Sequence, residues 1–186
     1  LRENISEVDI AKWINAMNEV AEGTRLGIPV LIASNSRNEN AERTFGMNDA
    51  VGVFSTWPGT LGLAAAALGD MKNGGDAQII SEFAEYARKE WAASGIRKGY
   101  MYMLDTATDP RWQRIYGTFG ESTELICDAA KRLILGFQGE ELDENSVALT
   151  MKHFPGGGAR ENGFDPHYEE GKFNVYKTPG SLEKYH

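Results

Sequence analysis

The chain has few of the features that would tie it to a disulfide scaffold, a membrane or a nucleic acid. Its 186 residues include one cysteine, Cys127, which excludes an internal disulfide. No apolar run reaches the roughly 18 residues that a membrane-spanning helix needs, and no charged-then-apolar leader opens the sequence. Lysines and arginines number 19 against 27 aspartates and glutamates, which gives a net charge of -8 without a basic stripe. We therefore expect neither a membrane nor a nucleic-acid partner.

These absences leave the compartment open. The protein is expected to be soluble, and either cytoplasmic or secreted or periplasmic after removal of a leader. The lone Cys127 falls within a helical pattern. Because free cysteines are usually buried, we expect it to be a small apolar residue of the core.

Apolar spacing predicts helices that alternate with apolar runs typical of buried parallel strands. Ser6 is placed to cap a first helix that ends near Gly23. Further helices are expected over 61–68, over 78–94 with a stop at Gly95, and over 122–136 with Ser122 as cap. The strand-like runs are IPVLIAS (28–34), GYMYMLD (99–105) and VALTMKHF (147–154). This alternation predicts an α/β fold with a parallel sheet covered by helices.

Lys152 and His153 end the third run and are followed by FPGGG. Ligands of parallel sheets collect at the carboxyl ends of the strands, which makes this pair the first candidate for a binding site. Successive strand residues point to opposite faces, so both side chains reach one ligand only if the backbone departs from a regular pleat. The alternative is that His153 packs in the core and Lys152 is a solvated charge at a strand end.

A second motif, LDTATDPRWQRIYGTFGEST (104–123), follows the end of the second run. It mixes charged and aromatic side chains, a composition suited to a polar, ring-shaped ligand, since guanidinium groups bind hydroxyls and aromatic faces stack on apolar patches. Arg114 is its main candidate. Simpler explanations stay open for its neighbours: Asp109 and Arg111 as a loop ion pair, and Trp112 as part of the core.

Together with TRLGIPVLIASN (24–35) and FSTWPGTLGLAAA (54–66), these motifs resemble the N-terminal domain of glycoside hydrolase family 3, which contains β-glucosidases and β-xylosidases. The resemblance implies a parallel (β/α) barrel of TIM type. Such a barrel needs about 250 residues, so this chain is expected to hold about its first half. Residues 1–186 would be part of a single barrel domain, with the remaining barrel and a C-terminal domain absent.

The resemblance also implies roles for individual residues. Lys152, His153 and Arg114 would bind hydroxyls of the terminal sugar, and a non-proline cis peptide is expected next to His153. Asn35 stands where many family members have a sugar-binding aspartate, and Arg37 is positioned to compensate for the missing charge.

The segment ARENGFDPHYEEGK after the glycines would edge the sugar pocket, which makes Arg160 and His167 further candidates. Members that hydrolyse N-acetylglucosaminides carry a histidine in the glycine loop. This chain has Gly157 there, which favours a glucosidase or xylosidase.

The activity implied is that of a retaining, exo-acting β-glycosidase that removes terminal β-D-glucosyl or xylosyl residues from oligosaccharides or aryl glycosides. The nucleophilic aspartate and the acid/base glutamate would lie downstream of His186, so no catalytic residue is expected in this chain and the fragment alone would be inactive. No cofactor is implied. An arc of barrel strands also leaves an edge, which the rest of the barrel or a partner chain would cover.

Two other classes of function stay open. The chain could be a non-catalytic sugar-binding or structural piece, or its glycines could form a phosphate cradle beside Lys152, although the spacing does not match GxxxxGK[ST]. A metal site made from His153, Glu161, Asp165 and His167 is disfavoured, because no two of them have a recognised ligand spacing.

Overall fold

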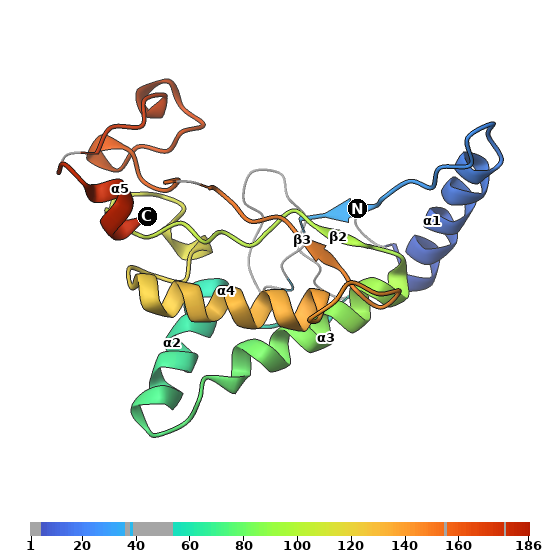
Figure 1. The fold of residues 1–186 in the computed structure, drawn as a ribbon, viewed down its shortest axis with the longest axis horizontal. Helices are drawn as coiled ribbons and strands as arrows, with labels where there is room; N and C mark the ends of the chain where they lie inside the picture. The colour runs from blue at the N-terminus through green and yellow to red at the C-terminus, as the bar shows by residue number, and fades with distance from the viewer. Residues whose placement is uncertain (1–4, 36–37, 39–53, 155, 177) are drawn as a thin grey trace. The chain divides into compact units, whose positions relative to one another are not determined.

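The protein is described from a computed structural model that defines residues 5–35, 38, 54–154, 156–176 and 178–186 (Figure 1). The chain divides into two compact units. The first takes in residues 1–57, 81–100 and 134–150, and the second takes in 58–80, 101–133 and 151–186.

The first unit contains a parallel sheet of three strands in the order β1-β2-β3. These are β1 (Ala33–Ser34), β2 (Lys98–Gly99) and β3 (Ala148–Leu149). Ala33 pairs with Lys98, and Lys98 pairs with Ala148. The predicted α/β class and parallel sheet are therefore confirmed.

The strands are much shorter than the apolar runs that predicted them. Each has two residues, whereas the runs have seven or eight. Met101 and Tyr102 follow β2 and are both buried, yet they lie outside the sheet, and the peptide between them is cis. An apolar run thus predicts burial, but burial does not require the backbone to pair with a neighbouring strand.

Helix α1 (Glu7–Glu22) begins as the sequence predicts. The Ser6 hydroxyl accepts a hydrogen bond of 3.1 Å from the Asp9 backbone N–H, and Gly23 caps the other end. Such a cap satisfies one of the backbone donors that the first helical turn leaves unpaired. Ile10 and Ile14 are buried, whereas Trp13 is exposed.

Helices α3 (Gln78–Ser94) and α4 (Thr123–Gln138) match the predicted ranges closely. The C-terminal end of α4 lies beside α3 in the first unit (Figure 1). In the first unit the Phe137 ring of α4 contacts Phe83 and Trp91 of α3 edge-on, with centroids 6.5 and 5.6 Å apart. Gly136 permits this approach, since a Cβ there would lie 2.4 Å from the Ala84 Cβ.

The second unit holds α2 (Thr60–Lys72), which is longer than the helix predicted over 61–68, and the first turns of α4. It also contains three single turns, η1 (Ile115–Gly117), η2 (Glu161–Gly163) and η3 (Glu169–Gly171), and α5 (Ser181–Tyr185). The Thr60 hydroxyl donates 3.2 Å to the Tyr116 carbonyl and ties α2 to η1.

Two observations bear on what the sequence predicted for the surface. Cys127 is exposed, so the expectation that it is buried was wrong. It follows Ile126, which is buried, and one step along a helix turns a side chain by about 100° away from the packed face. Among the described residues, no helix is long and apolar enough to cross a membrane.

The contact between α3 and α4 predicts that two glycine-to-alanine changes have opposite effects. Gly136→Ala should lower the free energy of unfolding by about 1–3 kcal/mol, because its methyl group would overlap Ala84. In Gly69→Ala of α2 the new Cβ would have no heavy atom within 4 Å apart from nearby atoms of its own helix backbone, so this change should raise the free energy of unfolding by about 0.4–1 kcal/mol. Urea unfolding of both variants checks this, and a similar gain in both would contradict the close approach.

Candidate functional site

Lys152 and His153 lie where the chain pairs with the segment after β2. Lys152 forms an isolated parallel bridge with Met103, and the Leu104 backbone N–H donates 2.8 Å to the Lys152 carbonyl. The Lys152–His153 peptide is cis, which confirms both the predicted cis bond and the departure from a regular pleat. Lys152 is 7 % exposed, whereas the His153 side chain is 41 % exposed. The alternative of a core histidine beside a solvated lysine is therefore wrong.

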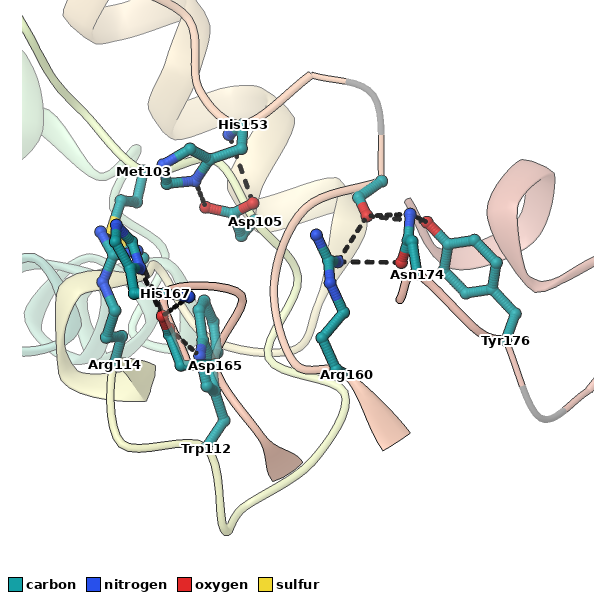
Figure 2. A network of polar contacts seen from close by, with 11 residues as sticks. Met103, Asp105, Trp112, Arg114, His153, Arg160, Asp165, His167, Asn174 and Tyr176 are labelled. Carbon is teal, nitrogen blue, oxygen red and sulfur yellow. Dashed lines mark hydrogen bonds and ion pairs between the residues drawn. The ribbon is translucent and has the colours of Figure 1, made fainter. Parts of the chain in front are cut away.

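Asp105 binds His153 through both of its carboxylate oxygens. Oδ1 accepts 3.2 Å from the His153 backbone N–H, and Oδ2 lies 2.8 Å from Nδ1 of the imidazole (Figure 2). The Asp105 side chain is fully buried. Sequence reasoning did not assign Asp105 to the site. One feature of the sequence does point to Asp105. It ends the apolar run GYMYMLD, just as Lys152 and His153 lie at the end of the run VALTMKHF.

The Arg114 side chain contacts the segment that is paired with Lys152. Its guanidinium Nη2 lies 3.2 Å from Sδ of Met103, the residue that the bridge sets beside Lys152. Nη1 lies 3.8 Å from Oδ2 of Asp165 and, among the described residues, has no hydrogen-bond partner. Arg114, Lys152 and His153 are thus gathered around the Met103–Asp105 segment of the second unit.

Asp165 connects Arg114 to the loop after the glycines. Its buried carboxylate accepts 2.6 Å from Trp112 Nε1 and 3.0 Å from the His167 backbone N–H, and it also contacts the His167 imidazole (Figure 2). Burial acts to raise the pKa of Asp165. The donors of His167 and Trp112, helped by the charge of Arg114, outweigh burial, so the pKa of this carboxyl is lowered.

Arg160 contacts the glycine loop itself. Its Nη1 donates 2.8 Å to Asn174 Oδ1 and approaches the Gly156 carbonyl at 3.4 Å. The Tyr176 hydroxyl donates 2.7 Å to the same carbonyl (Figure 2). Arg160 therefore holds the loop in place. The His167 side chain is 60 % exposed and pairs with Asp165. Contact of Arg160 or His167 with a sugar stays a prediction.

The other residues singled out by the sequence have different surroundings. Asn35 directly follows β1 and is partly buried, and it belongs to the first unit. Arg37 lies outside the described residues. Asp109 and Arg111 form the loop ion pair that was the simpler explanation, at 2.6 Å, and hydrogen bonds from the Arg111 side chain and backbone lower the pKa of Asp109 to about 2. Trp112 is buried, as the core explanation has it.

No set of histidine, cysteine, aspartate and glutamate side chains grouped to hold a metal ion occurs among the described residues. The two buried carboxylates of the site, Asp105 and Asp165, each accept hydrogen bonds from N–H groups. The arrangement gathers two buried cations and a partly exposed imidazole around one segment, and charged donors form strong hydrogen bonds with oxygen acceptors such as hydroxyls.

Comparison with known proteins establishes the family. The chain belongs to the glycosyl hydrolase family 3 N-terminal domain family, whose model matches residues 2–178. It is 44 % identical over 172 residues to β-glucosidase C of Emericella nidulans, covering 92 % of this chain and 26 % of that protein. It is 38 % identical over 170 residues to the periplasmic β-glucosidase/β-xylosidase of Dickeya chrysanthemi, covering 90 % of this chain and 25 % of that protein.

The solved structures agree. The β-glucosidase of Listeria innocua in complex with glucose superimposes with a TM-score of 0.63 at 25 % identity, over 85 % of this chain and 19 % of that chain. The resemblance inferred from the motifs is therefore confirmed. The chain spans about a quarter of the length of the curated relatives it matches.

The environment of Asp165 predicts a stability effect that depends on pH. Asp165→Asn removes the charge that faces Arg114 and an acceptor oxygen, and it should lower the free energy of unfolding at about pH 7 by about 1.5–3 kcal/mol. The pKa of Asp165 is lowered from 3.8 on folding. Its stabilisation is therefore present above about 3.8 and is lost as the pH falls through the folded pKa, so the variant should lose less stability than the wild type below about pH 4.

Urea unfolding at about pH 7 and about pH 3 measures this difference. Asp128→Asn is a matched control, because Asp128 pairs with Arg132 at 2.7 Å on a partly exposed part of α4. Surface pairs of this kind contribute about 0–1 kcal/mol. An equal loss of unfolding free energy in the two variants would show that the contacts of Asp165 contribute no more than a surface ion pair.

Proposed function

We propose that this chain supplies the sugar-binding half of the active site of a retaining, exo-acting β-glycosidase that removes terminal β-D-glucosyl or xylosyl residues. The observation that carries the proposal is the gathering of Arg114, Lys152 and His153 around Met103 and Asp105 in one unit. The names of the relatives, β-glucosidase and β-glucosidase/β-xylosidase, support the substrate class.

The donors suit a pyranose with several hydroxyls. Lys152 and Arg114 are buried, and a hydrogen bond from a charged donor is about twice as strong as one between neutral groups. Nη1 of Arg114 has no hydrogen-bond partner among the described residues, so it has donor capacity to give a hydroxyl oxygen. Such bonds tighten as the ring flattens toward an oxocarbenium ion and contribute several kcal/mol in the transition state.

The cleavage itself is assigned to carboxylates outside this chain. A retaining glycosidase needs two carboxyl groups about 5–5.5 Å apart, one as nucleophile and one as acid/base. The buried carboxylates of Asp105 and Asp165 are already engaged by His153, Trp112 and His167, which leaves them structural roles. We infer that the nucleophilic aspartate and the acid/base glutamate come from the remaining barrel and a C-terminal domain.

We infer that the three-stranded parallel sheet is part of a TIM-type barrel domain to which all of residues 1–186 belong. The family model and the superposition on a longer β-glucosidase support this inference. The rest of the barrel would then cover the open edges of the sheet.

Gly157 supports glucosidase or xylosidase specificity over N-acetylglucosaminidase specificity. A Cβ at this position would lie 1.9 Å from Oδ1 of Asp105, so a histidine does not fit into this loop as it stands.

The proposal predicts a large kinetic effect of Lys152→Ala in the complete protein. The variant should lose kcat/KM for an aryl β-glucoside by about 100-fold or more, because it removes a charged donor whose bond tightens in the transition state. The loss should appear in kcat as well as in KM. Steady-state kinetics with 4-nitrophenyl glucoside and xyloside measure both parameters.

Lys72→Ala provides the control, since Lys72 lies exposed at the end of α2. It should keep the wild-type kcat/KM. A Lys152→Ala enzyme within twofold of the wild type would remove Lys152 from the sugar site, and a complete protein that hydrolyses no glycoside would favour the non-catalytic alternative.

A further inference from the structure

We propose that Asp105 is a positioning residue that holds His153 as the tautomer protonated on Nδ1 and leaves Nε2 to meet the ligand. Only the identity of that ligand, a sugar hydroxyl, rests on the proposed function. The proton position and the orientation of the ring follow from the contacts of Asp105 alone.

The two oxygens of Asp105 take two N–H groups of the same residue. Oδ1 accepts from the His153 backbone at 3.2 Å, and Oδ2 lies 2.8 Å from Nδ1 of the ring. An ionised carboxylate is only an acceptor, so Nδ1 must carry the hydrogen. The hydrogen bond on one ring nitrogen sets the state of the other, which makes Nε2 a hydroxyl acceptor in the neutral ring.

The burial of the pair fixes the direction in which the ring points. The Asp105 side chain is fully buried, whereas the imidazole is 41 % exposed. Figure 2 shows Nδ1 turned toward Asp105 and the opposite ring nitrogen turned away from it. We call the two contacts between Asp105 and His153 the clamp. The clamp holds the ring edge that carries Nδ1, and the edge that carries Nε2 is turned away from Asp105.

The glycine loop closes directly over this clamp. The Gly157 backbone N–H donates 3.0 Å to the His153 carbonyl. A Cβ on Gly157 would lie 1.9 Å from Asp105 Oδ1 and 2.7 Å from His153 Cβ. The absence of a side chain at Gly157 therefore leaves room for the Asp105 carboxylate. A side chain at position 157 would displace Asp105 or His153.

A second aspartate–histidine pair shows what is particular to this one. Asp165 also binds both the backbone and the ring of a histidine, His167, but it accepts from Trp112 and faces Arg114 as well. The hydrogen bonds of Asp105 within the described residues come from His153 alone. His186 is near enough for electrostatic interaction with Asp105.

The substitution Asp105→Asn tests the tautomer of His153. An aspartate offers two acceptor oxygens to the two N–H groups of His153, whereas an asparagine offers one acceptor oxygen and one NH₂ donor. The backbone N–H of His153 cannot lose its proton, so the amide oxygen goes to it and the amide NH₂ faces Nδ1. The ring then accepts at Nδ1 and carries its proton on Nε2. Asp105→Asn should invert the tautomer with almost no change in shape.

The experiment is a long-range ¹H–¹⁵N spectrum of the complete protein with labelled histidine, at about pH 8, where an ordinary histidine is neutral. Signals of His153 are assigned by their absence in His153→Gln. We expect the Nδ1–H form in the wild type and the Nε2–H form in Asp105→Asn, with kcat/KM for an aryl β-glucoside reduced on the order of 100-fold. Gly157→Ala should lose the Nδ1–H form as well, which tests the clamp through a second variant.

The outcomes separate the two proposals. The same tautomer of His153 in the wild type and in both variants would overturn the positioning role of Asp105. An inverted tautomer with unchanged kcat/KM would uphold that role and overturn the sugar contact of His153. Asp76→Asn, an exposed aspartate of the second unit, is the control and should leave both the spectrum and the kinetics as in the wild type.

Discussion

Burial of charge is the constraint on which the second unit depends. Two carboxylates and two cations, Asp105, Asp165, Arg114 and Lys152, are all withdrawn from solvent there. A buried charge without partners costs far more free energy than a single domain can spare, so each must be matched by hydrogen bonds or by an opposite charge. The acids are matched by donors from His153, His167 and Trp112. These matches join Asp105 to His153 and Trp112 to Asp165, which brings together the segments that carry Arg114 and Lys152.

The helices were predictable because their signals are local. The range of α3 follows from its apolar spacing and from Gly95, whose φ of 88° favours glycine, and α1 and α4 follow from Ser6 and Ser122 as caps. The strands were overestimated because an apolar run reports burial and not pairing. The exposure of Cys127 follows from its position on α4, next to the buried Ile126, and not from its residue type, which favours burial.

The site was predictable only in part, and the division has a physical reason. Arg114, Lys152 and His153 stand in recognisable motifs, so the resemblance to a family was enough to select them. The roles of Asp105 and Asp165 depend on partners 48 and 53 residues away, which no local pattern reveals. Motifs select the candidate groups for a ligand, whereas the buried carboxylates that pair with their neighbours become visible only when the chain is folded.

The signs of these charges also constrain the chemistry assigned to the proposed site. A sugar substrate is neutral, but its oxocarbenium-like transition state gathers positive charge at the anomeric carbon and the ring oxygen. Buried cations close to those atoms would oppose that charge, since interactions between charges are strong where water is excluded. Lys152 and Arg114 therefore favour catalysis only if they bind hydroxyls on the far side of the ring. In the proposed site, the carboxylates that face the anomeric carbon would then approach from the side opposite to Lys152 and Arg114.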